Sequence, residues 1–369
     1  MAIKVAFYAD QASGLGHLAR AVWLTRLLNN ERRIQSAIVC GCPVIQQMPV
    51  APEVFHWRLP CLPTRATSPG DAFKQLQERA QSICDFVAHW QPDVFVVDHF
   101  PIGVGGELAA VFDRAIREKW TTRFVIGVPY TQGIWASPWK TGQWARRFEV
   151  YHHALGYNDA SFDPVLADLP MYTKATTRRY FGVVAPRPLP RSPERTSAAR
   201  KIVVSTGGGE DGHRLYPLIL AACAEYLRKG RIQLSLVCGP NSLITNRHVY
   251  EQTPGVRMVS ALSAVQSTEY ADVVISNCGY NSAYTLIQSN LPIIFIPRPT
   301  IFGEQETRAK KLANLTGVWN IDERSPERFT LNFRSALSEA VEMGSCERKL
   351  PFRVVDEGSC SHAFLTTAN

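Results

Sequence analysis

Residues 273–297 have the sequence VVISNCGYNSAYTLIQSNLPIIFIP, which contains the strongest fold signal in the chain. The opening apolar run, Val273-Val274-Ile275, is typical of a strand buried on both faces of a parallel sheet. Small and polar residues follow as far as Ser282, then a helix is expected to about Ser289 and a second strand over residues 292–296. This order of strand, glycine-containing turn, helix and strand predicts one βαβ unit.

The polar turn of this unit falls at the carboxyl end of a strand, where open α/β sheets bind ligands. The helix that follows offers free N–H groups and a partial positive charge at its first turn, which suits a phosphate. An ordinary strand-to-helix turn has the same composition, so this stretch alone leaves both interpretations open.

Composition limits the class of protein. The chain has 369 residues, enough for two domains, with 46% hydrophobic and 20% charged residues, as expected of a folded protein. No apolar run reaches the roughly 18–20 residues of a membrane-spanning helix. The N-terminus enters a strand pattern without signal-peptide features, so a cytoplasmic location is expected. Nine cysteines without zinc spacing indicate reduced thiols and no metal site.

The formal net charge of +8 favours an anionic partner, either a nucleotide phosphate or a membrane surface. The basic residues are dispersed along the chain and no RNA-binding motif is present, so nucleic acid is disfavoured as a partner.

Strands and helices alternate in both halves of the chain, which predicts a parallel, doubly wound α/β sheet in each. Residues 186–200 are rich in proline and arginine and are predicted to form an exposed linker. The predicted domains are therefore residues 1–185 and residues 201–369.

The first half contains a glycine loop followed by a helix, with the sequence DQASGLGHLAR over residues 10–20. Gly14 and Gly16 allow the backbone to turn sharply and approach a ligand, and His17 falls in the first turn of the helix. The full dinucleotide fingerprint is absent because Ala19 occupies its last position. His17 is either a structural residue or a catalyst.

Two further features of the first half involve hydrogen-bonding or aromatic side chains. Asp98 and His99 follow a buried strand, at the sheet edge that binds ligands. Trp135 and Trp139 lie in a segment rich in glycine, serine and proline, suited either to an acceptor pocket or to packing between domains.

In the second half, a strand over residues 201–205 leads into TGGGEDG at residues 206–212. The N–H groups of three successive glycines can surround a diphosphate. No Walker lysine follows, which disfavours a P-loop NTPase. Farther on, Glu304, Gln305 and Glu306 could hydrogen-bond a sugar or ribose, or the two carboxylates could simply favour a helix N-terminus.

Together these motifs resemble those of two-domain glycosyltransferases of the GT-B type, whose Rossmann-like domains face each other across a cleft. The sequence GLGH at 14–17 resembles the N-terminal loop of the lipid II-forming N-acetylglucosaminyltransferases. Residues 276–282, with Leu291-Pro292 and Glu304-Gln305, resemble their nucleotide-sugar signature. The motifs GLGHLxR, VVD, GYND with a following DP, GGGEDG and SxCGYN occur in the same order in a bacterial group of predicted glycosyltransferases, which this chain resembles along most of its length.

The resemblance implies a function: transfer of a sugar, with inversion, from a nucleoside-diphosphate donor to a hydroxyl or amine acceptor. It implies that His17 is a general base or stabilises charge near the transferred sugar, and that Asp98 is also a catalytic residue. No metal or cofactor beyond the donor is expected. The acceptor is expected to be lipid-linked or natural-product-like, and peripheral membrane contact is compatible with the basic charge.

The resemblance also assigns binding residues to each domain. The acceptor-side residues of the first domain are Asp10, His99, Trp135 and Trp139. The residues expected at the donor and its phosphates are Gly16, Gly207, Gly208, Gly209, Asn277, Gly279, Asn281, Ser282, Glu304 and Gln305.

One position departs from the family pattern. The relatives carry a ribose-binding glutamate six residues after the signature glycine, where this chain has Thr285. A threonine hydroxyl cannot accept hydrogen bonds from two ribose hydroxyls as a carboxylate does. Either Glu304 or Glu306 replaces the glutamate, or the donor is bound differently.

Two alternatives remain at the level of sequence. The nucleotide-sugar hydrolases of nonulosonic acid synthesis have a similar GxGHxxR loop, here Gly14, Gly16, His17 and Arg20, and a similar Asp-His pair; in that function His17 would activate water. A non-enzymatic binding module would explain Thr285 as part of a decayed site.

Overall fold

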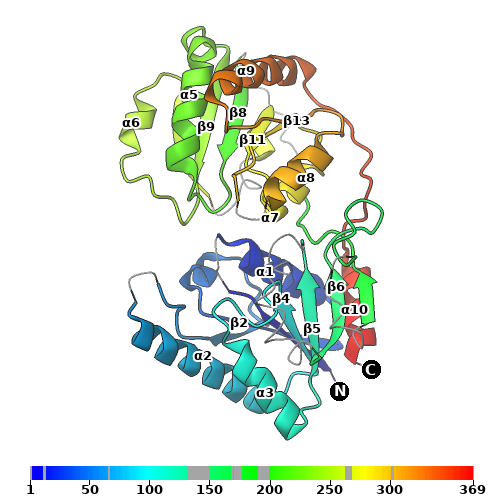
Figure 1. The fold of residues 1–369 in the computed structure, drawn as a ribbon. Coiled ribbons are helices and arrows are strands. Elements are labelled where there is room, and N and C mark those ends of the chain that lie inside the picture. The colour runs from blue at the N-terminus through cyan, green and yellow to red at the C-terminus, as the bar shows by residue number, and fades with distance from the viewer. Residues whose placement is uncertain are drawn as a thin grey trace. The chain divides into compact units, whose positions relative to one another are not determined.

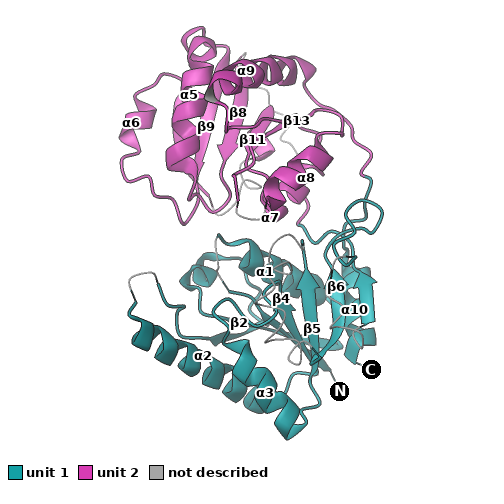
Figure 2. Ribbon diagram, in the orientation of Figure 1, with its two compact units in different colours: residues 1–185, 351–369 teal, residues 186–350 magenta. Residues whose placement is uncertain are grey.

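The computed structural model describes residues 2–10, 14–64, 67–130, 149–167, 169, 177–189, 199–261, 268–300 and 303–368. They form two compact units, one of residues 1–185 with 351–369 and the other of residues 186–350 (Figure 2). Within the described ranges, no helix is both long and apolar enough to cross a membrane.

The first unit is built on a seven-stranded parallel sheet with the order β3-β2-β1-β4-β5-β6-β7 (Figure 1). Its strands are β1 (Ile3–Tyr8), β2 (Ile34–Cys40), β3 (Phe55–Arg58), β4 (Val94–Asp98), β5 (Arg123–Val128), β6 (Tyr151–Gly156) and β7 (Thr177–Tyr180). The helical elements are α1 (Gly16–Leu28), η1 (Pro43–Gln47), α2 (Pro69–Trp90), α3 (Leu108–Glu118) and α10 (Glu357–Ala368).

Helices cover both faces of this sheet, and its central strands are accordingly mostly apolar. Every residue of β4 is buried, as a strand covered on both faces requires. Alternate residues of β1 pack on opposite sides: Tyr8 joins the core under α2 and α3, whereas the Phe7 ring contacts Phe364 of α10.

The second unit contains a six-stranded parallel sheet with the order β10-β9-β8-β11-β12-β13. Its strands are β8 (Arg200–Ser205), β9 (Ile232–Cys238), β10 (Val256–Ser260), β11 (Val273–Ser276), β12 (Ile293–Phe295) and β13 (Val318–Asn320). The helices are α5 (Gly212–Arg228), α6 (His248–Glu251), α7 (Tyr280–Leu286), α8 (Glu304–Leu312) and α9 (Pro326–Met343).

The predicted doubly wound α/β fold is confirmed in each unit. The βαβ unit predicted over residues 273–297 is β11-α7-β12, although α7 begins at Tyr280 and ends at Leu286, three residues earlier than expected. The strands absent from the prediction, β3, β7 and β13, are all edge strands of three or four residues. They are too short, and β3 and β7 too exposed, to show an apolar pattern.

The predicted end of the first domain at residue 185 coincides with the boundary between the units, but the predicted second domain, 201–369, extends too far. Residues 351–369 return to the first unit, where the Phe364 ring lies 5.5 Å from that of Phe7 and 5.9 Å from that of Phe181. The apolar side chains of α10 cover one face of the first sheet, which provides the physical reason for the return. Of the predicted linker, residues 190–198 lie outside the described residues.

Candidate functional site

In the first unit, three polar side chains meet where β4 ends and α1 begins. The Nδ1 atom of His17 lies 2.6 Å from Oδ2 of Asp98. Arg20 binds the same carboxylate with two nitrogens, Nε at 3.0 Å from Oδ1 and Nη2 at 2.6 Å from Oδ2. Because β1 and β4 are parallel neighbours, the helix that follows β1 starts beside the last residue of β4. All three side chains are buried, and His17 is the most exposed at 8%.

This arrangement keeps Asp98 ionised. Burial by itself would raise the pKa of Asp98, but the charge of Arg20 and hydrogen bonds from His17 and Arg20 outweigh burial and lower the pKa to about 2. A carboxylate at Nδ1 fixes the tautomer of a histidine and leaves Nε2 for a substrate proton. The structure thus brings together His17 and Asp98, two residues that the sequence indicated separately as catalytic candidates.

His99, predicted on the acceptor side, lies beside this cluster. Its ring stacks on that of His17 with the centroids 5.5 Å apart, and its backbone adopts a left-handed φ of 69°. Neither ring nitrogen has a hydrogen-bond partner in the described part of the chain, although the side chain is fully buried. Burial, and next the neighbouring His17, lower the pKa of His99 well below its usual value, so the ring is neutral.

Asp10, a carboxylate predicted on the acceptor side, belongs to a buried ionic network instead. Its carboxylate pairs with Arg79 and accepts from the Gly41 amide at 3.0 Å. Arg79 also contacts Glu107 at 3.2 Å, and Tyr8 donates to Glu107. Asp10 is thus bound by the protein and holds the start of the glycine loop. Trp135 and Trp139 lie outside the described residues.

In the second unit, two of the three glycines after β8 adopt conformations that other residues rarely take. Gly207 has φ of 64° and Gly209 of 99°. The loop packs directly against the backbone after β9, because a Cβ built on Gly239 would lie 2.3 Å from the carbonyl oxygen of Gly208. A Cβ on Gly207 would lie 3.8 Å from Oγ of Ser282, so this loop and the first turn of α7 are adjacent.

Hydrogen bonds and ion pairs join the predicted donor motifs. The amide of Asn277 donates to Asp211 at 2.9 Å, and Nη1 of Arg298 lies 3.3 Å from the same carboxylate oxygen. Arg298 also lies 3.6 Å from Glu210, which accepts from Asn241 at 2.9 Å. The carboxylates of the GGGEDG loop therefore hold two side-chain amides and one guanidinium at the sheet edge.

Several buried polar atoms at this edge have no hydrogen-bond partner among the described residues. They include Oγ of Ser276 and Oδ1 of Asn277, at the carboxyl end of β11. Buried polar groups are nearly always paired, so unpaired ones together indicate a place for water or a ligand. Beside them, a Cβ built on Gly279 would meet no atom within 4 Å.

Thr285 and the remaining predicted donor residues differ in their exposure and in their contacts. Thr285 is only 1% exposed and its hydroxyl has no partner in the described structure, so it lies within the packed side of α7. Glu304 accepts from Thr300, and the buried Gln305 accepts from the Arg298 backbone at 3.1 Å. Gln305 thus shapes the loop after β12. Asn281 and Ser282 lie in the first turn of α7, and Gly16 opens α1.

Sequence reasoning did not assign roles to Arg20, Arg298 and Asp211. The signal for Arg20 was its spacing, because residues i and i+3 of a helix share a face and Arg20 follows His17 by three. Arg298 has no comparable signal, since its contacts with Glu210 and Asp211 span 88 and 87 residues of sequence.

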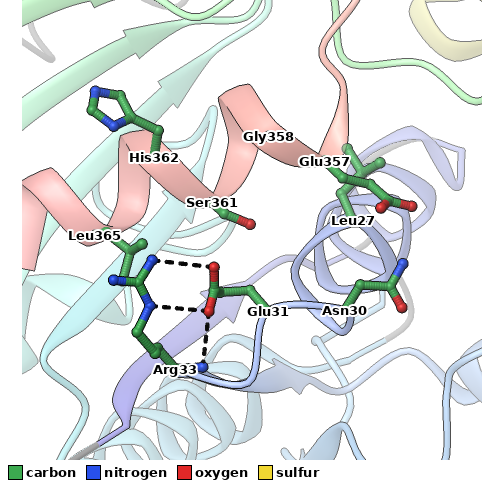
Figure 3. Close-up of a pocket in the computed structure, with 9 residues that line it drawn as sticks. All are labelled: Leu27, Asn30, Glu31, Arg33, Glu357, Gly358, Ser361, His362 and Leu365. Atoms are coloured by element: carbon green, nitrogen blue, oxygen red, sulfur yellow. Dashed lines mark hydrogen bonds and ion pairs between the residues drawn. The ribbon is translucent and has the colours of Figure 1, made fainter.

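A surface hollow of about 370 Å³ lies at the opposite end of α1, lined by Leu27, Asn30, Glu31, Arg33 and residues of α10 (Figure 3). Two charged residues of this lining, Arg33 and Glu31, form an ion pair with each other, with Nε of Arg33 3.1 Å from Oε1 of Glu31. The hollow is separated from His17 by most of the length of α1. In the described part of the chain, no three His, Cys, Asp or Glu side chains are grouped as metal ligands.

Comparison with known proteins finds a family match in the second unit and similar folds over nearly the whole chain. Residues 202–343 match the glycosyltransferase family 28 C-terminal domain. A curated relative from Helicobacter acinonychis, named UDP-N-acetylglucosamine--N-acetylmuramyl-(pentapeptide) pyrophosphoryl-undecaprenol N-acetylglucosamine transferase, is 26% identical over 109 residues. The match covers 28% of this chain and 31% of the relative, so it spans about a third of the relative's length.

Two solved structures share the fold over nearly the whole chain. The glycotransferase of kitacinnamycin has a TM-score of 0.62 at 13% identity, covering 100% of this chain and 94% of its own. A putative UDP-N-acetylglucosamine 2-epimerase from Listeria monocytogenes also has a TM-score of 0.62, at 12% identity, with 99% and 95% covered. At these identities the likeness shows the fold alone.

The fold is therefore that of the GT-B class, two Rossmann-like α/β units in one chain. Part of the second unit is similar to the C-terminal domain of glycosyltransferase family 28, and the resemblance predicted from the motifs is confirmed.

Proposed function

We propose that this protein is a glycosyltransferase that moves a sugar from a nucleoside diphosphate to a hydroxyl or amine acceptor, with inversion. The observation that carries the proposal is the family 28 match over residues 202–343, because that segment contains the glycine loop and the unpaired polar atoms at the sheet edge. The comparisons support transfer and give no support to the hydrolase alternative.

The donor would bind at the carboxyl edge of the second sheet. N–H groups of residues 207–209 and of the first turn of α7 would face the diphosphate, with Asn277 and Ser282 beside it. Thr285 is too buried to replace a ribose-binding glutamate, so the ribose would be held by other groups; Glu304 is the carboxylate proposed for that role or for the sugar. Since the curated relative is named for a UDP-sugar, UDP-sugars are the first donors to test.

His17 would act as the general base in the first unit. Its Nε2 would take the acceptor proton as the acceptor atom bonds to the anomeric carbon and the bond from that carbon to the diphosphate oxygen breaks. The diphosphate leaves with the bonding electron pair, and N–H groups of the second unit would stabilise its charge without a metal. Attack opposite the leaving group gives inversion.

The acceptor side would include His99, which lies beside His17, while Asp10 would contribute by holding the loop rather than by contact. We propose a lipid-linked or natural-product-like acceptor and a cytoplasmic location with peripheral membrane contact, which the net charge of +8 supports. Nucleic acid is not a proposed partner.

The test is nucleoside diphosphate release from UDP-, dTDP- and GDP-sugars, measured with and without a cell extract as acceptor source. Wild type is compared with His17→Ala. Release that requires extract and is lost in the variant supports the transferase. Release in buffer alone, lost in the variant, would instead indicate the hydrolase, and no release from any donor by folded protein would indicate a binding role.

A further inference from the structure

Arg20 is placed to act on His17 through a shared carboxylate. It lies one helical turn after His17 on α1, is 2% exposed, and binds both oxygens of Asp98. Its Nη2 is also 3.2 Å from Nδ1 of His17, the nitrogen that contacts Asp98 at 2.6 Å. The guanidinium therefore touches both members of the histidine–carboxylate pair.

A histidine paired with an isolated carboxylate is drawn towards its charged form, because the carboxylate stabilises an imidazolium. A charged imidazole has no lone pair with which to accept a proton, so it cannot start the proposed reaction as a base. The bidentate arginine opposes formation of the charged imidazole in two ways. It neutralises the carboxylate, and it places a positive charge beside the ring.

We propose that Arg20 is a positioning residue that keeps His17 in its proton-accepting form by pairing with Asp98. This inference rests on the proposed function, in which His17 is the base. Asp98 then fixes the ring and its tautomer without converting it to a cation, and Nε2 remains free for the acceptor proton.

The other groups around His17 fit this role. His99 faces the ring from the end of β4 and is neutral, and Phe100 lies 5.1 Å away, so neither supplies a competing charge. The Tyr130 ring packs against the His99 ring, with the two centroids 4.1 Å apart. Arg20 itself lies 5.5 Å from the Tyr157 ring, which holds the guanidinium in place without neutralising it.

The experiment is a histidine ring ¹⁵N NMR titration of wild type, Arg20→Gln and Arg20→Lys, with the His17 signal assigned by its absence in His17→Asn. In Arg20→Gln the ring should take up its second proton at a pH about one unit or more higher than in wild type. Arg20→Lys keeps the charge and should titrate close to wild type. The matched control is Arg26→Gln, which removes an exposed arginine from the same helix.

A second readout uses catalysis. In Arg20→Gln the acidic limb of the kcat/KM profile should move to higher pH, in step with the shift of the NMR titration. A purely structural arginine would lower activity equally at every pH. Titration of Arg20→Gln at the wild-type pH would overturn the inference.

Loss of Arg20 leaves a buried carboxylate with fewer partners and can prevent folding. Asp98→Asn then provides an independent test, because Arg20 would act on the ring unopposed and its titration should move to lower pH. An unchanged titration in that variant would also overturn the inference. The NMR titration does not require turnover. If the protein releases no diphosphate, the proposed function is refuted, but the titration still tests the role of Arg20.

Discussion

The side-chain amide of Asn277 donates a hydrogen bond to Asp211 across 2.9 Å, although 66 residues of sequence separate them. This bond joins the two motifs that were predicted to bind the donor diphosphate, one after β8 and one after β11. Arg298 reaches the same carboxylate oxygen at 3.3 Å, so one aspartate holds two groups that could bind an anion.

We expect Arg298→Gln to weaken binding of the nucleoside diphosphate about tenfold, because a charged hydrogen-bond donor contributes about 1.5–3 kcal/mol. Asp211→Asn should bind as well as wild type or better, since it removes a negative charge from the loop and retains an acceptor for Asn277. Isothermal titration calorimetry measures both. Arg324→Gln, which removes an exposed arginine paired with Asp322, is the control; equal affinity in the two arginine variants would contradict the prediction.

Two glycines of the second unit should respond differently to alanine. In Gly239→Ala the new methyl group would lie 2.3 Å from a backbone oxygen of Gly208, so the loop must shift and both thermal stability and diphosphate affinity should fall. In Gly279→Ala the methyl group meets no protein atom within 4 Å and φ is −61°, so Tm should stay unchanged. Affinity should still fall, because the methyl group occupies space proposed for the phosphate. Unchanged affinity in folded Gly279→Ala would place the phosphate elsewhere.

Thr285 should not contribute to donor binding. Thr285→Val removes a buried hydroxyl without a partner in the described structure, so the free energy of unfolding should be unchanged or rise by up to about 1 kcal/mol, with the same diphosphate affinity. Thr285→Glu would place a charge at a side chain that is 1% exposed and should destabilise the protein by several kcal/mol. Calorimetry and thermal denaturation test both, and tighter ribonucleotide binding by Thr285→Glu would refute this account.

His99 should make the first unit less stable in mild acid. Burial holds its pKa well below 6.5 in the folded protein, so below about pH 6.5 the unfolded chain binds a proton that the folded chain does not. Stability therefore falls with decreasing pH, by at most about 1.4 kcal/mol per unit for one group. The pKa of Asp98 is about 2, so its own contribution is lost only below about pH 4, outside this window.

Urea unfolding at pH 5, 6 and 7 measures this dependence. His99→Asn is the test variant because asparagine tolerates the left-handed backbone at this position. Its stability should change less between pH 7 and 5 than that of wild type. The same slope in both proteins would show that His99 is not the responsible group.

Removal of the Phe364 ring should loosen the first unit and leave the second unchanged. Phe364→Ala should cost about 3–5 kcal/mol of local stability, because the ring is fully buried against Phe7 and Phe181. Hydrogen exchange followed by mass spectrometry should show faster exchange in β1 and unchanged exchange in β8. Leu331→Ala, at a side chain 72% exposed in α9, is the control. Faster exchange in β8 would contradict the assignment of α10 to the first unit.

The sequence by itself determined the α/β class, the boundary at residue 185 and the edge of each sheet where the candidate site residues lie. These follow from local patterns: apolar runs mark strands covered on both faces, and glycines mark turns that need left-handed backbone. The proximity of His17 to Asp98 could also be inferred from the sequence. Both lie near the carboxyl ends of parallel strands, and parallel strands present their carboxyl ends at one edge of a sheet.

Only the tertiary structure decided how individual polar side chains are used. Asp10 is bound by Arg79, 69 residues away, and Arg20 reaches Asp98 across 78 residues. Thr285 faces the packed side of α7, and α10 returns to the first unit rather than the second. Charge, burial and pairing depend on contacts between distant segments, and sequence periodicity carries information only about neighbours along one strand or helix.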